Sequence, residues 1–180
     1  ASSPFRDGKG DVVREFVDAC REFKLKAGLY LSPWDRNAAV YGDSPRYNTF
    51  YWTQLTELLT QYGRIDEVWF DGANGEGPNG RKQIYDWPNT WALVRKLQPE
   101  AVMFSDAGPD VRWIGNENGV AGMTNWSTFD PTVVPVPGLS GAAVTKMLRE
   151  GDPNGSVWCP GETDVSIRPG WFYHPADDAK

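Results

Sequence analysis

The chain has 180 residues, a net charge of −6 and a sequence pI near 4.8. This length suffices for one domain with a hydrophobic core, and a composition of 40% apolar and 23% charged residues is typical of a soluble globular protein. The acidic balance without a stripe of Lys and Arg argues against nucleic acid as a partner, and no apolar run reaches the roughly 18 residues that a membrane span needs.

The first elements along the chain are a helix and a strand. Asp11 is placed to cap a helix whose apolar residues form one stripe, namely Val12, Val13, Phe16, Val17, Cys20 and Phe23. The apolar run 26–32, closed by Pro33, predicts a short strand buried on both faces. A loop rich in Trp, Asp, Arg and Asn continues to residue 46.

The same order then repeats. Helices are predicted over 48–62, 83–97 and 140–149, the second of them interrupted by Pro88. Strands are predicted over 65–70, 101–105 and 156–159, with loops at 71–80 and from the third strand through Asp130.

Alternating helices and strands indicate repeated βα units with parallel strands, in either a doubly wound sheet or a (β/α)8 barrel. The segment GANGEGPNG after the second strand lacks the spacing of a dinucleotide-binding turn, and polar and aromatic residues follow each strand, which favours the barrel. A complete barrel needs eight strands and about 250 residues, whereas four strands are counted here. We therefore predict an α/β fold, a partial (β/α)8 TIM-like barrel.

Several kinds of catalytic chemistry have little support in the sequence. Cys20 and Cys159 have no metal-ligand or redox spacing and are predicted to be buried thiols. The single histidine, His174, offers little for a Ser/His/Asp site, and we predict neither a metal nor another cofactor. The sequence has nine Trp, seven Tyr and eight Phe, and aromatic rings can stack on the faces of sugars. This content favours a carbohydrate site, although any single ring more often lies in the hydrophobic core.

The remaining candidates are carboxylates at strand ends. Asp71 directly follows an apolar strand in DEVWFDG, where a carboxylate points into the mouth of a barrel, although Asp is also common in turns. A glycosidase needs two carboxylates, and Asp106, Glu117 and Glu162 are available as the second. Glu117 lies near an indole, an environment that suits a general acid, whereas Asp106 is explained as a turn residue.

Five motifs, in order over the whole chain, resemble α-L-fucosidases of glycoside hydrolase family 29. They are residues 8–15 (GKGDVVRE), 28–37 (GLYLSPWDRN), 69–75 (WFDGANG), 108–117 (GPDVRWIGNE) and 166–173 (SIRPGWFY). The resemblance implies a retaining exo-glycosidase that releases terminal α-L-fucose without a cofactor. The GPDVRWIGNE form resembles the branch that prefers α-1,3/1,4-linked fucose.

The resemblance also implies roles for individual residues. It makes Asp71 the nucleophile and Glu117 the general acid/base. Trp69 corresponds to an indole that contacts fucose. Residues expected in the substrate pocket are Tyr30, Trp34 and Trp171. Glu162 is expected either to bind a sugar hydroxyl or to pair with Arg168.

The chain lacks segments that members of the family carry. The His-His-Asp-Gly segment that family members carry upstream is absent, as are their last strands, so residues 1–180 are interpreted as a single segment from the centre of the catalytic domain. Such a segment exposes strand edges, and we expect it to form a homo-oligomer or to need the rest of the barrel. An inactive sugar-binding fragment is the alternative function, and an unrelated α/β binding protein is a third. A periplasmic or secreted location is suggested by the resemblance only.

Overall fold

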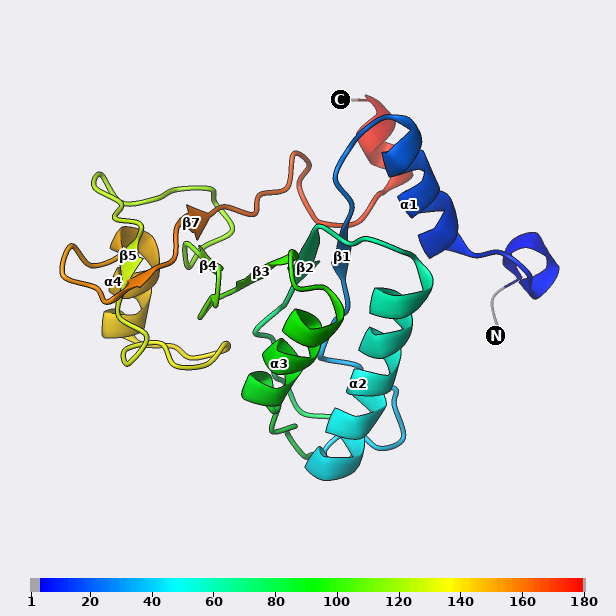
Figure 1. The fold of residues 1–180 in the computed structure, drawn as a ribbon, viewed down its shortest axis with the longest axis horizontal. Coiled ribbons are helices and arrows are strands. Elements are labelled where there is room, and N and C mark those ends of the chain that lie inside the picture. The colour runs from blue at the N-terminus through cyan, green and yellow to red at the C-terminus, as the bar shows by residue number, and fades with distance from the viewer. Residues whose placement is uncertain (1–3, 180) are drawn as a thin grey trace. The chain divides into compact units, whose positions relative to one another are not determined.

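A computed structural model describes residues 4–179 of the chain (Figure 1). The chain divides into two compact units, residues 1–103 and residues 104–180. The division falls inside strand β3 (Val102–Ser105). The parallel strands follow the order β1-β2-β3-β4-β7.

The first unit alternates helices with parallel strands. Its elements are η1 (Phe5–Gly8), α1 (Val12–Glu22), β1 (Gly28–Tyr30), α2 (Ser44–Gln61), β2 (Glu67–Trp69), α3 (Trp87–Leu97) and the start of β3. Helices α2 and α3 contact each other and lie side by side (Figure 1). The predicted order of helices and strands is confirmed in this unit.

The helices begin where capping chemistry allows. The side chain of Asp11 accepts a hydrogen bond of 2.9 Å from the amide of Arg14, which confirms the predicted cap of α1. Helix α2 begins at Ser44, before the predicted start, because Pro45 fits the first turn of a helix. The expectation that Pro88 interrupts a helix is wrong. Pro88 instead lies in the first turn of α3, where the missing N–H costs nothing.

Strands β1 and β2 pair in parallel, with Leu29 opposite Val68 and Tyr30 opposite Trp69. Val68 is 1% exposed, whereas Leu29 is only partly buried and Tyr30 is 52% exposed. The prediction of a first strand buried on both faces is therefore wrong. The reason is that β1 stands first in the order of the sheet and pairs with β2 on one side.

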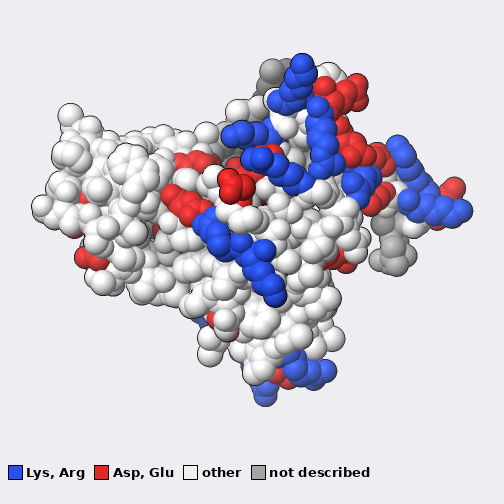
Figure 2. Space-filling model, in the orientation of Figure 1, with Lys and Arg blue, Asp and Glu red and all other residues white. Residues whose placement is uncertain are grey.

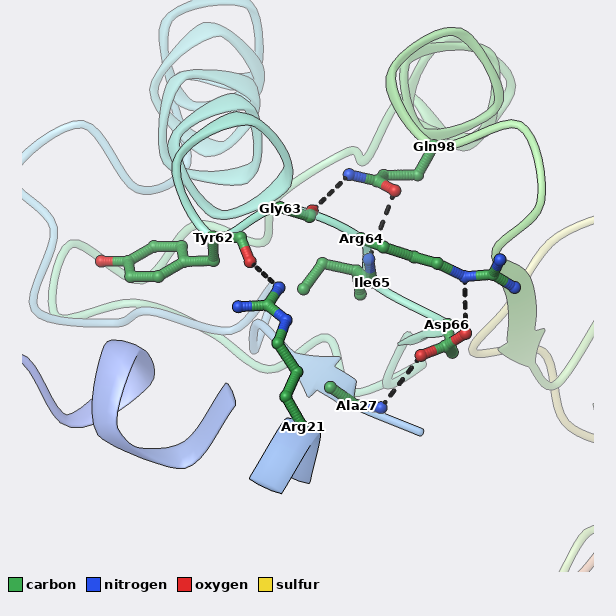
Figure 3. Close-up of polar contacts among 8 residues, drawn as sticks. All are labelled: Arg21, Ala27, Tyr62, Gly63, Arg64, Ile65, Asp66 and Gln98. Carbon is green, nitrogen blue, oxygen red and sulfur yellow. Dashed lines mark hydrogen bonds and ion pairs between the residues drawn. The ribbon is translucent and has the colours of Figure 1, made fainter. Parts of the chain in front are cut away.

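The turn between α2 and β2 is held by side chains from two other helices (Figure 3). Arg21 donates a hydrogen bond to the carbonyl oxygen of Tyr62 at the end of α2. Gln98, just after α3, donates to the carbonyl oxygen of Gly63 at 2.9 Å and accepts from the amide of Ile65 at 3.3 Å. The carbonyls that α2 leaves unpaired at its end thereby gain partners.

Asp66 ties this turn to β1. Its Oδ2 accepts a hydrogen bond of 3.1 Å from the amide of Ala27, and its Oδ1 accepts one of 2.8 Å from Nε of Arg64 (Figure 3). The amide of Asp66 also donates to the carbonyl oxygen of Ala27 at 2.8 Å. These bonds fix the point at which β2 starts and, through the strand, the position of Asp71 at its far end.

The second unit holds short strands and one helix. Its elements are the end of β3, β4 (Val111–Trp113), β5 (Thr128–Phe129), α4 (Ala142–Glu150), β6 (Val157–Trp158), β7 (Gly161–Glu162) and η2 (Pro175–Ala179). Strand β4 pairs in parallel with β3 and with β7. The predicted strand at 156–159 exists as β6, but it pairs antiparallel with β5 outside the main sheet. The count of four sheet strands is thus wrong, since β4 and β7 join the sheet.

Charges of both signs gather around α1, as the blue and red atoms of Figure 2 show. Arg6 pairs with Glu15 at 3.1 Å, and Arg21 pairs with Asp18 at 3.2 Å. These exposed pairs add little to stability. Within residues 4–179, every helix is too short or too polar to cross a membrane.

Candidate active site

Asp71 lies two residues past the end of β2, as the sequence predicts for a strand-end carboxylate. Its Oδ1 accepts a hydrogen bond of 2.7 Å from the amide of Ala73, and its Oδ2 accepts one of 2.9 Å from the hydroxyl of Tyr30. Each carboxylate oxygen therefore has a donor, and the orientation of the side chain is fixed. The side chain remains partly accessible.

Tyr30 links the two strands that carry the site. Its ring meets the ring of Trp69 edge to face, with centroids 5.2 Å apart. The pKa of Tyr30 lies above its ordinary value, chiefly because of burial, and the hydrogen bond to Asp71 raises it further while a hydrogen bond with Ser32 lowers it. The hydroxyl is consequently protonated at neutral pH and able to donate to Asp71.

Trp34, in the loop after β1, packs against the loop after β2. A Cβ atom added to Gly75 would lie 2.0 Å from Cζ2 of Trp34, so the indole covers the glycine backbone directly. The guanidinium of Arg36 lies 5.5 Å from the centroid of the Trp34 ring. The indole remains 38% exposed, which leaves surface for a ligand.

Four tyrosines that hydrogen-bond to these loops were not recognised from the sequence. Their hydroxyls bond to the main chain of the two loops, and they are Tyr41, Tyr47, Tyr51 and Tyr85. The hydroxyl of Tyr51 donates to the carbonyl oxygen of Leu31 at 2.8 Å, and that of Tyr85 donates to Ala73 at 3.1 Å. Leu31 follows Tyr30 directly, and Ala73 lies two residues after Asp71.

Glu117 lies in the second unit, in the loop after β4, and is exposed. Its Oε2 accepts a hydrogen bond of 3.3 Å from Nε1 of Trp171. The loop is shaped by Asn116, whose Oδ1 accepts from the amides of Asn118 and Val120 at 3.1 and 3.2 Å. The second unit therefore brings together two predicted site residues, the glutamate and Trp171.

Glu162 and Arg168 are the other predicted residues of this unit. Glu162 ends β7 and is paired in register with Trp113 of β4. The indole of Trp113 donates to Oδ1 of Asp164. Arg168 is exposed, and its guanidinium lies 5.7 Å from the centroid of the Tyr173 ring. The two roles expected for Glu162 remain predictions.

Arg112, inside the GPDVRWIGNE motif, is fully buried at 0% exposure. Its Nε donates to Leu148 at 3.1 Å, and its Nη2 donates to Asn125 at 3.1 Å and to Trp126 at 2.8 Å. Its Nη1 donates to the carbonyl oxygen of Cys159. Burial lowers the pKa of Arg112 below its ordinary value. This guanidinium ties β4, and with it the Glu117 loop, to α4 and to the turn before β7.

Cys20 and Cys159 are buried free thiols, as predicted. Over residues 4–179 no group of three or more His, Cys, Asp or Glu side chains is placed to hold a metal ion. A groove between α2 and α3, of about 710 Å³, is lined by helix residues such as Thr49, Trp52 and Lys96 and includes no residue of the strand-end loops.

Comparison with known proteins identifies relatives of the whole chain. The α-L-fucosidase family model matches residues 3–130. Alpha-L-fucosidase 1 of Arabidopsis thaliana is 51% identical over 180 residues, which cover 99% of this chain and 34% of the relative. The chain thus spans about a third of the length of the curated relatives it matches.

Solved structures agree. A glycoside hydrolase 29 family member from an unknown rumen bacterium is 46% identical with a TM-score of 0.85, covering 98% of this chain and 32% of that one. A glycoside hydrolase 29 fucosidase from Ruminococcus gnavus in complex with fucose is 28% identical with a TM-score of 0.72, covering 95% of this chain and 38% of that one. The predicted α/β fold with parallel strands, a partial TIM-like barrel, is confirmed. The chain belongs to the α-L-fucosidase family.

Proposed function

We propose that this chain carries the catalytic carboxylates of a retaining exo-α-L-fucosidase, with Asp71 as nucleophile and Glu117 as general acid/base. One observation carries the proposal. Both oxygens of Asp71 are held by donors at the end of a parallel strand, and one donor, Tyr30, packs its ring edge to face against Trp69. Relatives that match the full chain bear the name α-L-fucosidase, which supports the reaction class.

The proposed reaction proceeds by two displacements. Asp71 attacks the anomeric carbon of a terminal fucoside while Glu117 donates a proton to the leaving oxygen, so the glycosidic bond breaks and a fucosyl ester of Asp71 forms. Glu117, now a carboxylate, takes a proton from a water molecule that attacks the same carbon. Fucose leaves with its original anomeric configuration, and both carboxyl groups regain their starting states.

The proposed substrate is a glycan with terminal fucose in α-1,3 or α-1,4 linkage. The linkage rests on the GPDVRWIGNE motif, which contains Arg112, Trp113 and Glu117. A methylated, partly apolar sugar such as fucose suits aromatic surfaces, and Trp34 and Trp171 both keep exposed area at 38% and 52%. Neither a metal nor a cofactor is part of the proposal.

Hydrolysis of an aryl α-L-fucoside by the chain tests this function. We expect release of the aryl alcohol, an initial product in the α configuration by proton NMR, and loss of turnover in Asp71→Ala. Asp18→Ala is the matched control, because Asp18 is an exposed carboxylate paired with Arg21 on α1. Release of β-fucose, or equal activity of Asp71→Ala and Asp18→Ala, would refute the assignment.

A second candidate function is fucose binding without turnover. It is favoured by the exposed rings of Trp34 and Trp171, which offer surface for a sugar whether or not turnover occurs. Saturable binding of fucose by a chain that hydrolyses no aryl fucoside would support it over the first.

We also propose that the chain self-associates or is completed by further barrel segments. Large apolar side chains of the first unit are exposed: Val12 at 64%, Phe23 at 71% and Leu25 at 65%. Exposed apolar area of this kind favours association. Sedimentation velocity should show species heavier than 20.1 kDa at micromolar concentration, and a single concentration-independent species of that mass would contradict self-association.

A further inference from the structure

The side chain of Tyr47 contacts the main chain on both sides of Trp34. Tyr47 lies on α2 and is 1% exposed. Its hydroxyl donates a hydrogen bond of 2.6 Å to the carbonyl oxygen of Pro33 and accepts one of 3.1 Å from the amide of Asp35. A single buried oxygen therefore holds the residue before Trp34 and the residue after it.

This hydroxyl keeps its proton over the whole physiological range. Burial raises the pKa of Tyr47 to about 12, so it donates to Pro33 and accepts from Asp35 at the same time. The amide of Trp34 itself donates to Oγ of Ser32 at 3.3 Å. Because main-chain groups of three consecutive residues have partners, the backbone of Trp34 has little freedom.

The indole of Trp34 rests on a surface that a second tyrosine holds. Gly75, which the indole covers, accepts a hydrogen bond of 2.8 Å at its carbonyl oxygen from Tyr41. The rings of Tyr41 and Tyr47 meet edge to face, with centroids 5.0 Å apart. Tyr47 therefore holds the backbone around Trp34, and Tyr41 holds Gly75, on which the indole rests. Gly75 belongs to the loop that starts at Asp71.

We propose that Tyr47 is a positioning residue, which sets the orientation of the Trp34 indole toward the sugar through its paired hydrogen bonds to Pro33 and Asp35. The proposal deepens the proposed function and rests on it for the identity of the sugar. Tyr47 does not touch the substrate. It acts by keeping the exposed part of the indole in one place, so that binding does not have to order it.

Removing only the hydroxyl tests this role. In Tyr47→Phe the ring still fills its buried site, while the carbonyl of Pro33 and the amide of Asp35 lose their partner. The matched control is Tyr62→Phe, because Tyr62 is also buried, at 6% exposure, and its hydroxyl bonds to Asp11 instead of a strand-end loop. Spectra of the full chain with ¹⁵N-labelled tryptophan report the indole N–H groups, and Trp34→Phe assigns the signal of Trp34.

We expect Tyr47→Phe to shift or broaden the Trp34 indole signal while Tyr62→Phe leaves it unchanged. Titration with free fucose should show a dissociation constant about tenfold higher in Tyr47→Phe, because binding must then order an indole that is already held in the wild type. An unchanged Trp34 signal in Tyr47→Phe would overturn the proposal. A wild-type chain that binds no fucose would refute the proposed function, while the indole signal would still decide the positioning role.

Two further measurements keep the test decisive if Tyr47→Phe fails to fold. In the wild-type chain the amide of Asp35 should exchange slowly with solvent deuterium, because it donates to a buried oxygen. Exchange as fast as in the exposed residues of the same loop would overturn the proposal. Gly75→Ala must displace the indole, since its Cβ would lie 2.0 Å from Cζ2, and it should shift the same Trp34 signal and weaken fucose binding.

Discussion

Tyr30, the last residue of β1, donates a hydrogen bond of 2.9 Å to Oδ2 of Asp71, just past the end of the neighbouring strand β2. The two strands are parallel, so their carboxyl ends meet at the same edge of the sheet and bring the phenol and the carboxylate together. The hydrogen bond runs directly from the phenol to the carboxylate, and it orients the carboxylate. If the hydroxyl of Tyr30 orients Asp71, its removal should lower the activity of the candidate nucleophile.

Tyr30→Phe should therefore reduce kcat/KM for an aryl fucoside by about tenfold or more, since hydrogen bonds to charged groups contribute about 1.5–3 kcal/mol. The control is Tyr62→Phe, whose hydroxyl bonds to Asp11 at 3.3 Å instead of to a strand-end loop. Steady-state kinetics of the two variants provide the comparison. Equal kcat/KM values in Tyr30→Phe and the wild type would mean that the bond does not orient the nucleophile.

Glu117→Ala should separate substrates by their leaving groups. A natural glycan has a poor leaving group that needs a proton, whereas an activated aryl alcohol scarcely does. We expect a loss of several hundredfold on a fucosylated oligosaccharide and a much smaller loss in the first step on an activated aryl fucoside, measured as kcat/KM. Glu22→Ala, at the exposed end of α1, is the control. A proportional loss on both substrates would remove Glu117 from the role of acid.

Arg112→Met should destabilise the second unit strongly. The variant leaves acceptors on Leu148, Asn125, Trp126 and Cys159 without their donor, and Leu148 and Cys159 are buried. We expect the free energy of unfolding to fall by about 3 kcal/mol or more. Urea unfolding monitored by tryptophan fluorescence measures the change. Arg149→Met, an exposed arginine on α4, should differ from the wild type by less than about 0.5 kcal/mol. Equal stabilities of the two variants would contradict a structural role for Arg112.

Stability should fall at alkaline pH because of the buried tyrosines. The pKa of Tyr47 is raised from 10.0 to about 12, and burial also raises the pKa values of Tyr51 and Tyr85. The folded state holds these protons more tightly than the unfolded state, so their contribution is complete below about pH 10 and is lost as the pH rises through the folded-state values. Each such tyrosine adds about 1.4 kcal/mol per pH unit to the slope in that range.

Urea unfolding at a series of pH values from about 8 to about 11.5 tests this slope. Tyr47→Phe should show a shallower fall than the wild type between about pH 10 and about pH 11.5, because one titrating group is removed. Identical slopes in the two proteins would show that Tyr47 does not keep its proton in the folded state.

The sequence predicted Asp71 because its signal is local: an apolar strand, a carboxylate and a glycine in succession. Trp34, Trp69 and Tyr30 followed from the family resemblance alone. Tyr47 and Tyr51 were not recognised, because on a helix a tyrosine at core spacing looks like any apolar residue, and its hydroxyl partner lies in a different loop.

Strands β4 and β7 were not predicted, and for β4 the cause is physical. Strand β4 has three residues with Arg112 at its centre, and a buried arginine inside a strand has no signature in periodicity. Its burial depends on carbonyl groups supplied by α4 and by later loops, which no local pattern contains. The prediction for Pro88 was wrong because proline disrupts the interior of a helix but is favoured in its first turn. Helix α3 starts at Trp87, so Pro88 lies in the first turn.

The most direct test of the central claim is chemical trapping of the proposed nucleophile. A 2-deoxy-2-fluoro-α-L-fucoside with a good leaving group slows the second displacement of a retaining enzyme, so that the fucosyl ester accumulates. After incubation with the chain, peptide mapping by mass spectrometry should place one added 2-fluorofucosyl group on Asp71. An added group on another carboxylate, or turnover of the aryl fucoside with no covalent adduct formed, would contradict the account.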